Sequence, residues 1–247
     1  MSDLLAKNVR FAAIDFETTG RDPLQARATE VGIITYENGV EIERWGSLIN
    51  PQEEIPEEVV QLTGITNEAV KDQPIFADIA DEIAKRLEGQ YFLAYNASYD
   101  RTVLRAEMGR IGREVELKGV IDPLPYAWRY LRREKKTRNA RLETVAEYLG
   151  VELENAHRAT DDAAATAQVF LRLLEEIPEI PRGIEEFLGM QAALTMEMEE
   201  TFRGPRRRPT VSMSDVTVEL GAAYINGQIS DPLRFLFRRL PDVRDVR

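Results

Sequence analysis

The fold is decided by the stretch VRFAAIDFETTG, which covers residues 9–20. Its first part is a nearly continuous apolar run from Val9 to Phe16, and such a run is typical of a strand buried on both faces. Two acids stand at the end of the run: Asp15 precedes Phe16 and Glu17 follows it. Because side chains two residues apart on a strand point the same way, we expect both carboxylates on one side at the edge of a sheet, where a ligand can reach them.

The segments that follow predict a mixed α/β sheet. Two strand-like runs, residues 29–36 and 40–49, flank Asn38-Gly39, which is a strong signal for a hairpin turn. Apolar spacing and the Pro and Gly boundaries predict a short helix after Pro56, a longer one after Pro74, a strand at 91–95, and helices at about 97–108, 142–149 and 160–174. This order of strands and helices indicates the α/β class.

The composition changes after residue 176. Pro178 and Pro181 interrupt the pattern, and the sequence then predicts an acidic helix over 184–200, a basic segment at 203–209, a strand near 211–220 and a short apolar and basic stretch at 233–240. We therefore divide the chain into a first domain, residues 1–178, and a C-terminal extension, residues 179–247.

Residue usage narrows the chemistry. The 247 residues include no cysteine and a single histidine, His157. Disulfides, thiol nucleophiles, cysteine zinc sites and iron–sulfur clusters are therefore excluded, and any metal must be held mainly by oxygen, which favours Mg²⁺ or Mn²⁺. No apolar run approaches the length of a membrane span, and the first ten residues lack the apolar core of a signal peptide. We expect a cytoplasmic protein with no membrane partner.

The formal net charge of −11 argues against a polyanionic partner, but the distribution of charge does not. Residues 101–141 hold twelve Lys and Arg against five acids, a local balance of +7. A solvated helix and loop face is the ordinary explanation for such a stretch. The alternative is that its last seven basic residues follow the phosphates of a single strand: Arg129, Arg132, Arg133, Lys135, Lys136, Arg138 and Arg141.

Two later segments carry acids where acids are unusual. In a helix beginning near residue 97, Asp100 falls on the apolar stripe, although an acid in a first helical turn also interacts well with the helix dipole. In the helix after His157, Asp162 lines up with Leu173 and faces protein, whereas Asp161 faces water and suits a helix-start acid. A lone histidine is more often structural, but His157 is expected on the lead-in loop, where it is free to act as a general base.

Four carboxylates from three segments, Asp15, Glu17, Asp100 and Asp162, together with one histidine, make the kind of site that two divalent cations need for in-line attack at phosphorus. An acid-x-acid pair such as the first two is common by chance in a chain with this many acids, so its position at the end of a buried strand is what favours function. The sequence contains no glycine-rich phosphate loop and no Gly-x-Ser-x-Gly elbow that would compete.

Three segments resemble, in order and at ordinary spacing, the exonuclease motifs of the DEDDh 3′–5′ exonucleases: Asp15-Phe16-Glu17-Thr18-Thr19-Gly20, Asn96-Ala97-Ser98-Tyr99-Asp100 and His157-Arg158-Ala159-Thr160-Asp161-Asp162-Ala163. A fourth, Leu62-Thr63-Gly64-Ile65-Thr66, is similar to a segment of the bacterial members akin to the proofreading epsilon subunit of DNA polymerase III. The resemblance covers about residues 8–176. The resemblance implies that residues 1–178 form an exonuclease domain. The C-terminal extension, residues 179–247, has no counterpart in the family.

This resemblance implies an RNase H-like mixed sheet flanked by helices. It implies that two Mg²⁺ or Mn²⁺ ions are bound by Asp15, Glu17, Asp100 and Asp162. His157 would be the general base for hydrolysis that releases nucleoside 5′-monophosphates. The resemblance also implies that Thr18 and Thr19 meet the terminal nucleotide and that Asn96 supports the site. Asp122-Pro123 departs from the family, whose members often have aspartate followed by threonine, at a position outside the metal ligands.

Three functional hypotheses stay open. The leading one is a 3′–5′ exonuclease that acts on single-stranded or primer-end DNA, alone or in proofreading or repair. An alternative keeps the chemistry but makes the enzyme an exoribonuclease or oligoribonuclease, because contacts to the 2′-hydroxyl cannot be located from sequence. A non-enzymatic alternative is a module that holds a nucleic-acid end while residues 179–247 recruit a polymerase or clamp.

Overall fold

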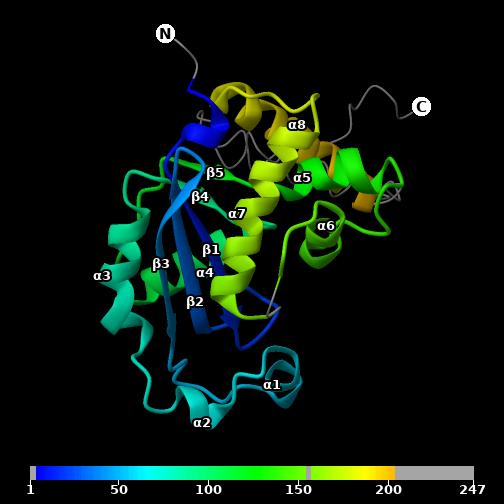
Figure 1. Cartoon of the computed structure of the whole chain (residues 1–247). Coiled ribbons are helices and arrows are strands. Elements are labelled where there is room, and N and C mark those ends of the chain that lie inside the picture. The colour runs from blue at the N-terminus through cyan, green and yellow to red at the C-terminus, as the bar shows by residue number, and fades with distance from the viewer. Residues whose placement is uncertain (1–3, 154–156, 204–247) are drawn as a thin grey trace, which may run out of the picture. The chain divides into compact units, whose positions relative to one another are not determined.

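The computed structural model describes residues 4–153 and 157–203 (Figure 1). Five strands form one sheet: β1 (Phe11–Thr18), β2 (Ala28–Glu37), β3 (Val40–Leu48), β4 (Tyr91–Leu93) and β5 (Gly119–Ile121). The helical elements are η1 (Ala6–Asn8), α1 (Glu57–Thr63), α2 (Asn67–Val70), α3 (Phe76–Leu87), α4 (Ser98–Arg110), α5 (Leu124–Ala127), η2 (Trp128–Arg132), α6 (Leu142–Tyr148), α7 (Ala159–Glu176) and α8 (Ile184–Arg203).

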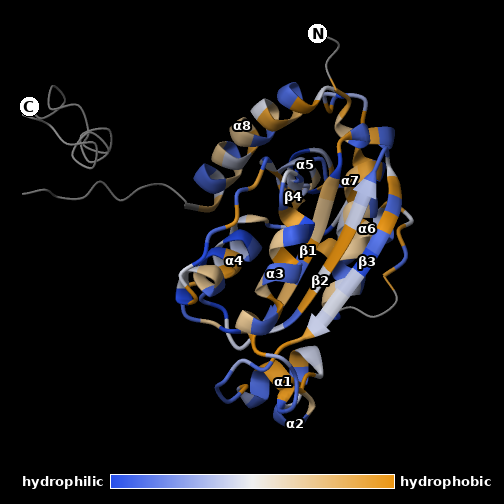
Figure 2. Ribbon diagram, turned by 90° about the vertical axis from the view of Figure 1, so that its left-hand side faces the viewer, coloured by the Kyte–Doolittle hydropathy of each residue, from blue (hydrophilic) through white to orange (hydrophobic). Residues whose placement is uncertain are grey.

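The strand order is β3-β2-β1-β4-β5, with β1 at the centre. β2 runs antiparallel to β1 and β3, whereas β4 and β5 run parallel to β1. The β2–β3 hairpin closes at Asn38 and Gly39, whose φ angles of 54° and 76° fit the predicted two-residue turn. In Figure 2, β1 and β2 are mostly orange, while the exposed edge strand β3 is largely blue and white. The predicted α/β class is confirmed.

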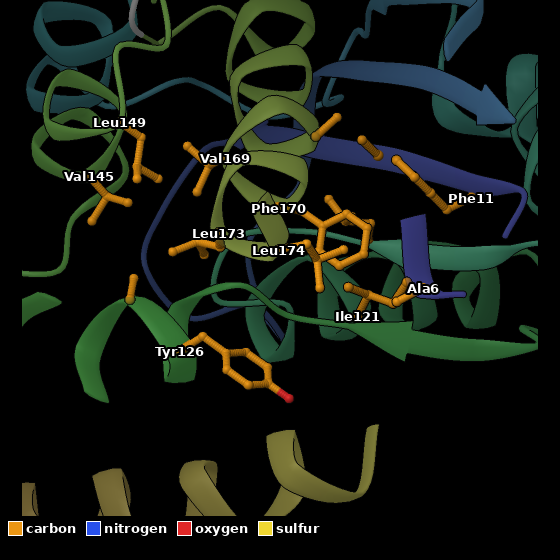
Figure 3. Packing of buried hydrophobic residues seen from close by; sticks show 14 of the residues in the cluster. Ala6, Phe11, Ile121, Tyr126, Val145, Leu149, Val169, Phe170, Leu173 and Leu174 are labelled. Carbon is orange, nitrogen blue, oxygen red and sulfur yellow. The ribbon is translucent and has the colours of Figure 1, made fainter. Parts of the chain in front are cut away.

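The hydrophobic core lies on both faces of the sheet. On β1, Phe11 and Ala13 join the cluster that includes α7. A second cluster with α3 and α4 contains Ala12, Ile14 and Phe16. Figure 3 shows the first cluster, in which the rings of Phe11 and Phe170 meet edge to face at 5.5 Å. Because side chains alternate along a strand, Asp15 and Glu17 continue the α7 face.

The C-terminal part of the described chain packs on this same core. Ile184, Phe187 and Leu194 of α8 are buried in the α7 cluster, and the Tyr126 hydroxyl donates a hydrogen bond to the Phe187 carbonyl at 2.6 Å. One compact unit extends to Phe202. The division near residue 178 stays a prediction about sequence domains. We propose that α8 belongs structurally with the first domain.

Other expectations differ from the structure or lie beyond it. The sequence predicts neither β5 nor α5, because a strand of three residues and a helix of four are too short to show apolar periodicity. The strand expected at 211–220 and the stretch at 233–240 lie outside the described residues. Within the described residues, no helix is both long and apolar enough to cross a membrane.

Glycine in β2 and β3 lets the N-terminus of α7 lie directly on the sheet. A Cβ atom at Gly32 would stand 2.4 Å from the backbone of the first turn of α7, and one at Gly46 would stand 2.5 Å from the Thr160 side chain. Gly32 is also the register partner of Asp15. The two glycines therefore allow the helix that carries Asp162 to approach the carboxylates of β1.

We expect Gly32→Ala to destabilise the protein. Alanine in a strand normally costs less backbone entropy than glycine, so a loss of stability would come from the clash with α7, at about 1–3 kcal/mol for overpacking. Thermal unfolding of the purified variant measures it. Gly189→Ala in α8 is the matched control, because a Cβ there meets nothing within 4 Å. If Gly32→Ala melts no lower than the control, the close approach of α7 is wrong.

Candidate active site

The acids of the first and third motifs meet at the end of β1. Asp15 and Glu17 lie on the α7 face of that strand, and Asp162, which is 9% exposed, comes from the first turn of α7. Carboxylate and imidazole atoms of Glu17, His157 and Asp162 all lie within 4.8 Å of one another, close enough to share a metal ion. Residues separated by about 140 positions in the chain thus form one cluster.

Asp100 reaches the same point from α4. It is 3% exposed, and its Oδ1 accepts a hydrogen bond from the backbone N–H of Phe16 at 3.1 Å. This bond ties the carboxylate to the residue between Asp15 and Glu17. The charge of Asp100 is a main contributor, after burial, to the raised pKa of Asp15. The acid that stands on an apolar helical stripe in the sequence is therefore part of the cluster.

Burial raises the pKa values of all four acids, and repulsion from the other acids of the cluster adds to the effect at Asp15 and Glu17. Burial, followed by the charges of Asp100 and Asp162, holds the pKa of Asp15 well above its usual range. Burial and the charge of Asp162 raise the pKa of Glu17 to about 8. Burial raises the pKa of Asp100 to about 7 and that of Asp162 to about 6. Four such carboxylates share protons at neutral pH unless a cation neutralises them.

His157 stands just before α7, as predicted, and is half-buried. Its φ of 69° lies in the left-handed region, which a histidine adopts at a cost that local contacts must offset. One such contact is the hydrogen bond that the His157 backbone N–H donates to Asp162 Oδ2 at 2.9 Å. The position of the imidazole is thus linked to the acid of α7.

Glu30 is a residue of the site that the sequence motifs do not indicate. It lies on β2 as the register partner of Glu17 and is 4% exposed. Its carboxylate accepts hydrogen bonds from Arg158 Nη2 at 2.9 Å, from Arg158 Nε at 3.2 Å, and from the backbone N–H of Ala159 at 3.1 Å. Glu30 therefore fastens the segment that carries His157 to the sheet. The only sequence signal for it is an acid inside an apolar strand run.

Asp122 supports the turn that leads into α4, a role that its sequence position does not indicate. Its carboxylate accepts hydrogen bonds from the backbone N–H groups of Asn96 at 3.1 Å, Ala97 at 3.0 Å and Leu124 at 2.9 Å. Asn96 has a φ of 62°, so the turn that leads into α4 is an unusual one and Asp122 holds it. The Asp-Pro departure from the family pattern leaves this support intact. Asn96 acts here through its backbone, and its predicted supporting role stays a prediction.

Thr18 and Thr19 hold the loop after β1. The Thr18 hydroxyl lies 2.6 Å from the hydroxyl of Tyr99 and donates to the Gly20 carbonyl at 2.8 Å. The Thr19 hydroxyl donates to Glu53 Oε1 at 2.6 Å. Both threonines are largely buried. Their side chains are used within the protein, and the predicted contact of Thr18 and Thr19 with the terminal nucleotide stays a prediction.

The remaining charged candidates are peripheral. Asp161, the predicted helix-start acid, lies 3.8 Å from Arg44 and is less buried than Asp162. In the basic stretch, Arg129 and Lys136 pair with Glu134, and Arg133 pairs with Glu197 of α8. Among the described residues, the other four members of the stretch, Arg132, Lys135, Arg138 and Arg141, form no ion pair. Nucleic-acid binding by this stretch stays a prediction.

The sequence matches a known family and known proteins. A family model described as Exonuclease (RNase_T) matches residues 12–170. The chain is 30% identical over 205 residues to the PolC-type DNA polymerase III of Caldanaerobacter subterraneus. The aligned region covers 83% of this chain and 14% of that protein. It is 31% identical over 173 residues to the 3′–5′ exonuclease DinG of Bacillus subtilis, covering 70% of this chain and 18% of DinG. The chain thus spans less than a fifth of the length of these relatives.

Solved structures share the fold. Escherichia coli exonuclease I in complex with a dT13 oligonucleotide superposes with a TM-score of 0.60 at 22% identity, over 68% of this chain and 41% of that one. Exonuclease X in complex with 5′ overhanging duplex DNA gives a TM-score of 0.56 at 21% identity, over 74% of this chain and 98% of that one. The predicted RNase H-like architecture is confirmed. Because the family model covers more than half of the sequence and spans all three motifs, the chain belongs to the Exonuclease (RNase_T) family.

Proposed function

We propose that this chain is a metal-dependent exonuclease that removes nucleotides from the 3′ end of DNA and releases nucleoside 5′-monophosphates. One observation carries the proposal: acids from β1, α4 and α7 converge on one point beside His157. The 3′–5′ direction agrees with the name of the relative DinG. A role in proofreading or repair follows if the chain works beside a polymerase, which the match to a part of PolC-type DNA polymerase III supports.

The four carboxylates fit a pair of hard divalent cations, and we propose that Asp15, Glu17, Asp100 and Asp162 hold them. All four offer only oxygen ligands, which Mg²⁺ and Mn²⁺ prefer. Burial raises the pKa values of all four, and repulsion within the cluster raises those of Asp15 and Glu17 further, so positive charge is what the cluster lacks. Bound there, the ions would lower the pKa of a water molecule and stabilise the charge on the leaving 3′ oxygen.

His157 would act as the general base in this scheme. Its half-buried imidazole stands within ligand distance of Glu17 and Asp162, so it can take the proton of a water that attacks beside the cluster and can pass that proton to solvent. The Glu30–Arg158 ion pair and the bond from the His157 N–H to Asp162 keep the imidazole at that position. Other surface residues would bind the nucleic-acid strand.

A digestion experiment tests the proposal. We expect 5′-labelled single-stranded DNA to shorten as a ladder from its 3′ end with Mg²⁺, to stay intact with EDTA, and to stay intact with Asp15→Ala. Matched RNA run beside it separates the DNA enzyme from an exoribonuclease. Faster digestion of RNA would move the protein to that alternative. Digestion of neither strand would favour a module that holds nucleic-acid ends, and continued digestion by Asp15→Ala would contradict the role of the cluster.

Metal binding should release protons. At neutral pH the carboxyls of Glu17 and Asp100, with pKa values of about 8 and about 7, are partly protonated without metal, and a cation must displace those protons. Affinity for Mg²⁺ is therefore expected to fall as the pH falls through about 8. Isothermal titration in buffers of different ionisation enthalpy measures the proton count. Buffer-independent heats and a pH-independent affinity would show that the acids are already ionised.

A further inference from the structure

A pocket of about 550 Å³ opens between the end of β4, the start of α6 and the C-terminal end of α8. Three aromatic residues line it, Tyr95, Trp128 and Phe202, and its polar groups include Asn96 and Arg141. A volume of this size is typical of small-molecule sites and holds one nucleotide. Residues of α8 supply one wall, and α8 lies outside the region 12–170 that the family model matches.

The pocket adjoins the acidic cluster. Asn96 starts the turn that leads into α4, the helix of Asp100. On the opposite side, Glu143 lines the pocket from α6, which packs against α7, the helix that carries Asp162. The pocket thus lies beside the turn before α4 and beside α6, next to both helices that carry acids of the cluster.

The aromatic wall is exposed and ordered by its neighbours. Phe202 is 73% exposed, the highest value among the large hydrophobic side chains of the described residues. Its ring lies 6.5 Å from that of Trp128 at an angle of 51°, and Trp128 is itself 4% exposed. On the other side, the Tyr95 hydroxyl donates to the Ala140 carbonyl at 2.7 Å and fixes the floor. An exposed ring against a rigid aromatic backing is a surface on which a flat base can stack.

The charge of the pocket suits a nucleic-acid strand. Arg141 is exposed on the rim and forms no ion pair with any described residue. It is the last member of the basic stretch, so a phosphate next to the bound base would meet a free guanidinium there. Glu143 is the acid of the pocket, and we expect the backbone of the strand to run along the Arg141 side instead.

We propose that this pocket takes an unpaired base of the substrate strand upstream of the nucleotide being removed, with the base stacked on Phe202 and a neighbouring phosphate at Arg141. The inference rests on the proposed exonuclease function and adds a second contact to it. It also gives α8 a role in substrate binding, because without that helix the pocket loses the wall formed by Met198 and Phe202.

The test compares Phe202→Ala with two matched variants of the full chain. Phe202→Tyr keeps an aromatic ring, and Met196→Ala removes another exposed side chain of α8, 66% exposed, that does not line the pocket. KM for an oligodeoxythymidylate and KM for p-nitrophenyl thymidine 5′-monophosphate, which contains a single nucleotide, are measured for each. Loss of one base–aromatic contact should raise KM for the oligonucleotide about tenfold in Phe202→Ala. The single-nucleotide substrate, the other two variants and kcat should stay unchanged.

Two further measurements keep the outcomes apart. Arg141→Gln should flatten the dependence of log affinity on log salt concentration by about 0.7, the value for one phosphate contact on a single strand. If the wild-type protein hydrolyses neither substrate, the proposed function fails, and oligonucleotide affinity measured by fluorescence anisotropy in EDTA still decides the pocket. An oligonucleotide KM or affinity that Phe202→Ala leaves unchanged would overturn the proposal and leave a protein segment as the occupant.

Discussion

Asp15→Asn is expected to abolish exonuclease activity and at the same time to raise the melting temperature of the metal-free protein. The carboxylate of Asp15 is surrounded by Asp100, Asp162 and Glu17, and burial adds to their repulsion. An amide of the same shape is neutral at every pH, so it avoids the cost of placing a carboxyl group here, but it no longer binds a cation well. Residues kept for function at a cost in stability are expected at such sites.

For Asp15→Asn we expect a large loss of kcat and a small gain in melting temperature. Loss of a ligand that stabilises transition-state charge should lower kcat by about a thousandfold or more. Relief of repulsion by about 1 kcal/mol should raise the melting temperature by about 2–4 °C for a chain of this size. Asp72→Asn is the control, because Asp72 is exposed and far from the cluster in sequence. A metal-free Asp15→Asn protein that melts below the wild type would contradict the account.

The stability difference should grow with pH. The pKa of Asp15 is raised in the folded protein, so near neutral pH the folded state binds more protons than the unfolded chain does, and wild-type stability falls as the pH rises through this range. Asp15→Asn lacks that titration. The gap in melting temperature should therefore widen from mildly acidic to mildly alkaline pH, and Mg²⁺ should close it by stabilising only the wild type.

Glu30→Ala is expected to lower kcat strongly although Glu30 is not proposed to touch substrate. The change releases Arg158 and leaves the buried N–H of Ala159 without its carboxylate acceptor. The segment that carries His157 then loses its main tie to β2. Displacement of a general base by about 1 Å can lower turnover by about a hundredfold. KM for DNA should change little, because the strand does not depend on this tie.

Two comparisons separate positioning from general destabilisation. Glu82→Ala breaks another Glu–Arg pair, with Arg86 on the surface of α3, and is expected to keep kcat. Glu30→Gln retains an acceptor for the Ala159 N–H and should recover part of the activity. A Glu30→Ala enzyme that keeps the wild-type kcat would show that Glu30 does not position His157. The same conclusion would follow if KM rose by the same factor by which kcat fell.

The sequence predicts the parts of this fold that have strong local signals. The apolar run before Asp15, the hairpin at Asn38-Gly39 and the helix that carries Asp162 all lie within a few residues of their expected bounds. The sequence also places the acids in suggestive positions, since strand alternation puts Asp15 and Glu17 on one side at the sheet edge and helical register puts Asp100 and Asp162 on protein-facing sides. The three motifs add the family, which the match to residues 12–170 confirms.

What the sequence does not predict depends on contacts between distant segments. Glu30 is one more acid in an acidic chain until β2 pairs with β1 and brings it to Arg158, 128 residues away. Asp122 stands after a strand of three residues that leaves no periodic signal, yet it holds the turn at Asn96. The hydroxyls of Thr18 and Thr19 belong to a family motif, and only the structure shows that protein groups already engage them.

The central claim is that the acidic cluster binds the catalytic cations. Anomalous diffraction from crystals of the wild-type protein soaked with Mn²⁺ tests it directly. The account predicts strong peaks with Asp15, Glu17, Asp100 and Asp162 as ligands, and loss of peaks from crystals of Asp15→Asn. Crystals that bind Mn²⁺ elsewhere, or bind none at this cluster while the enzyme digests DNA in the same buffer, would contradict it.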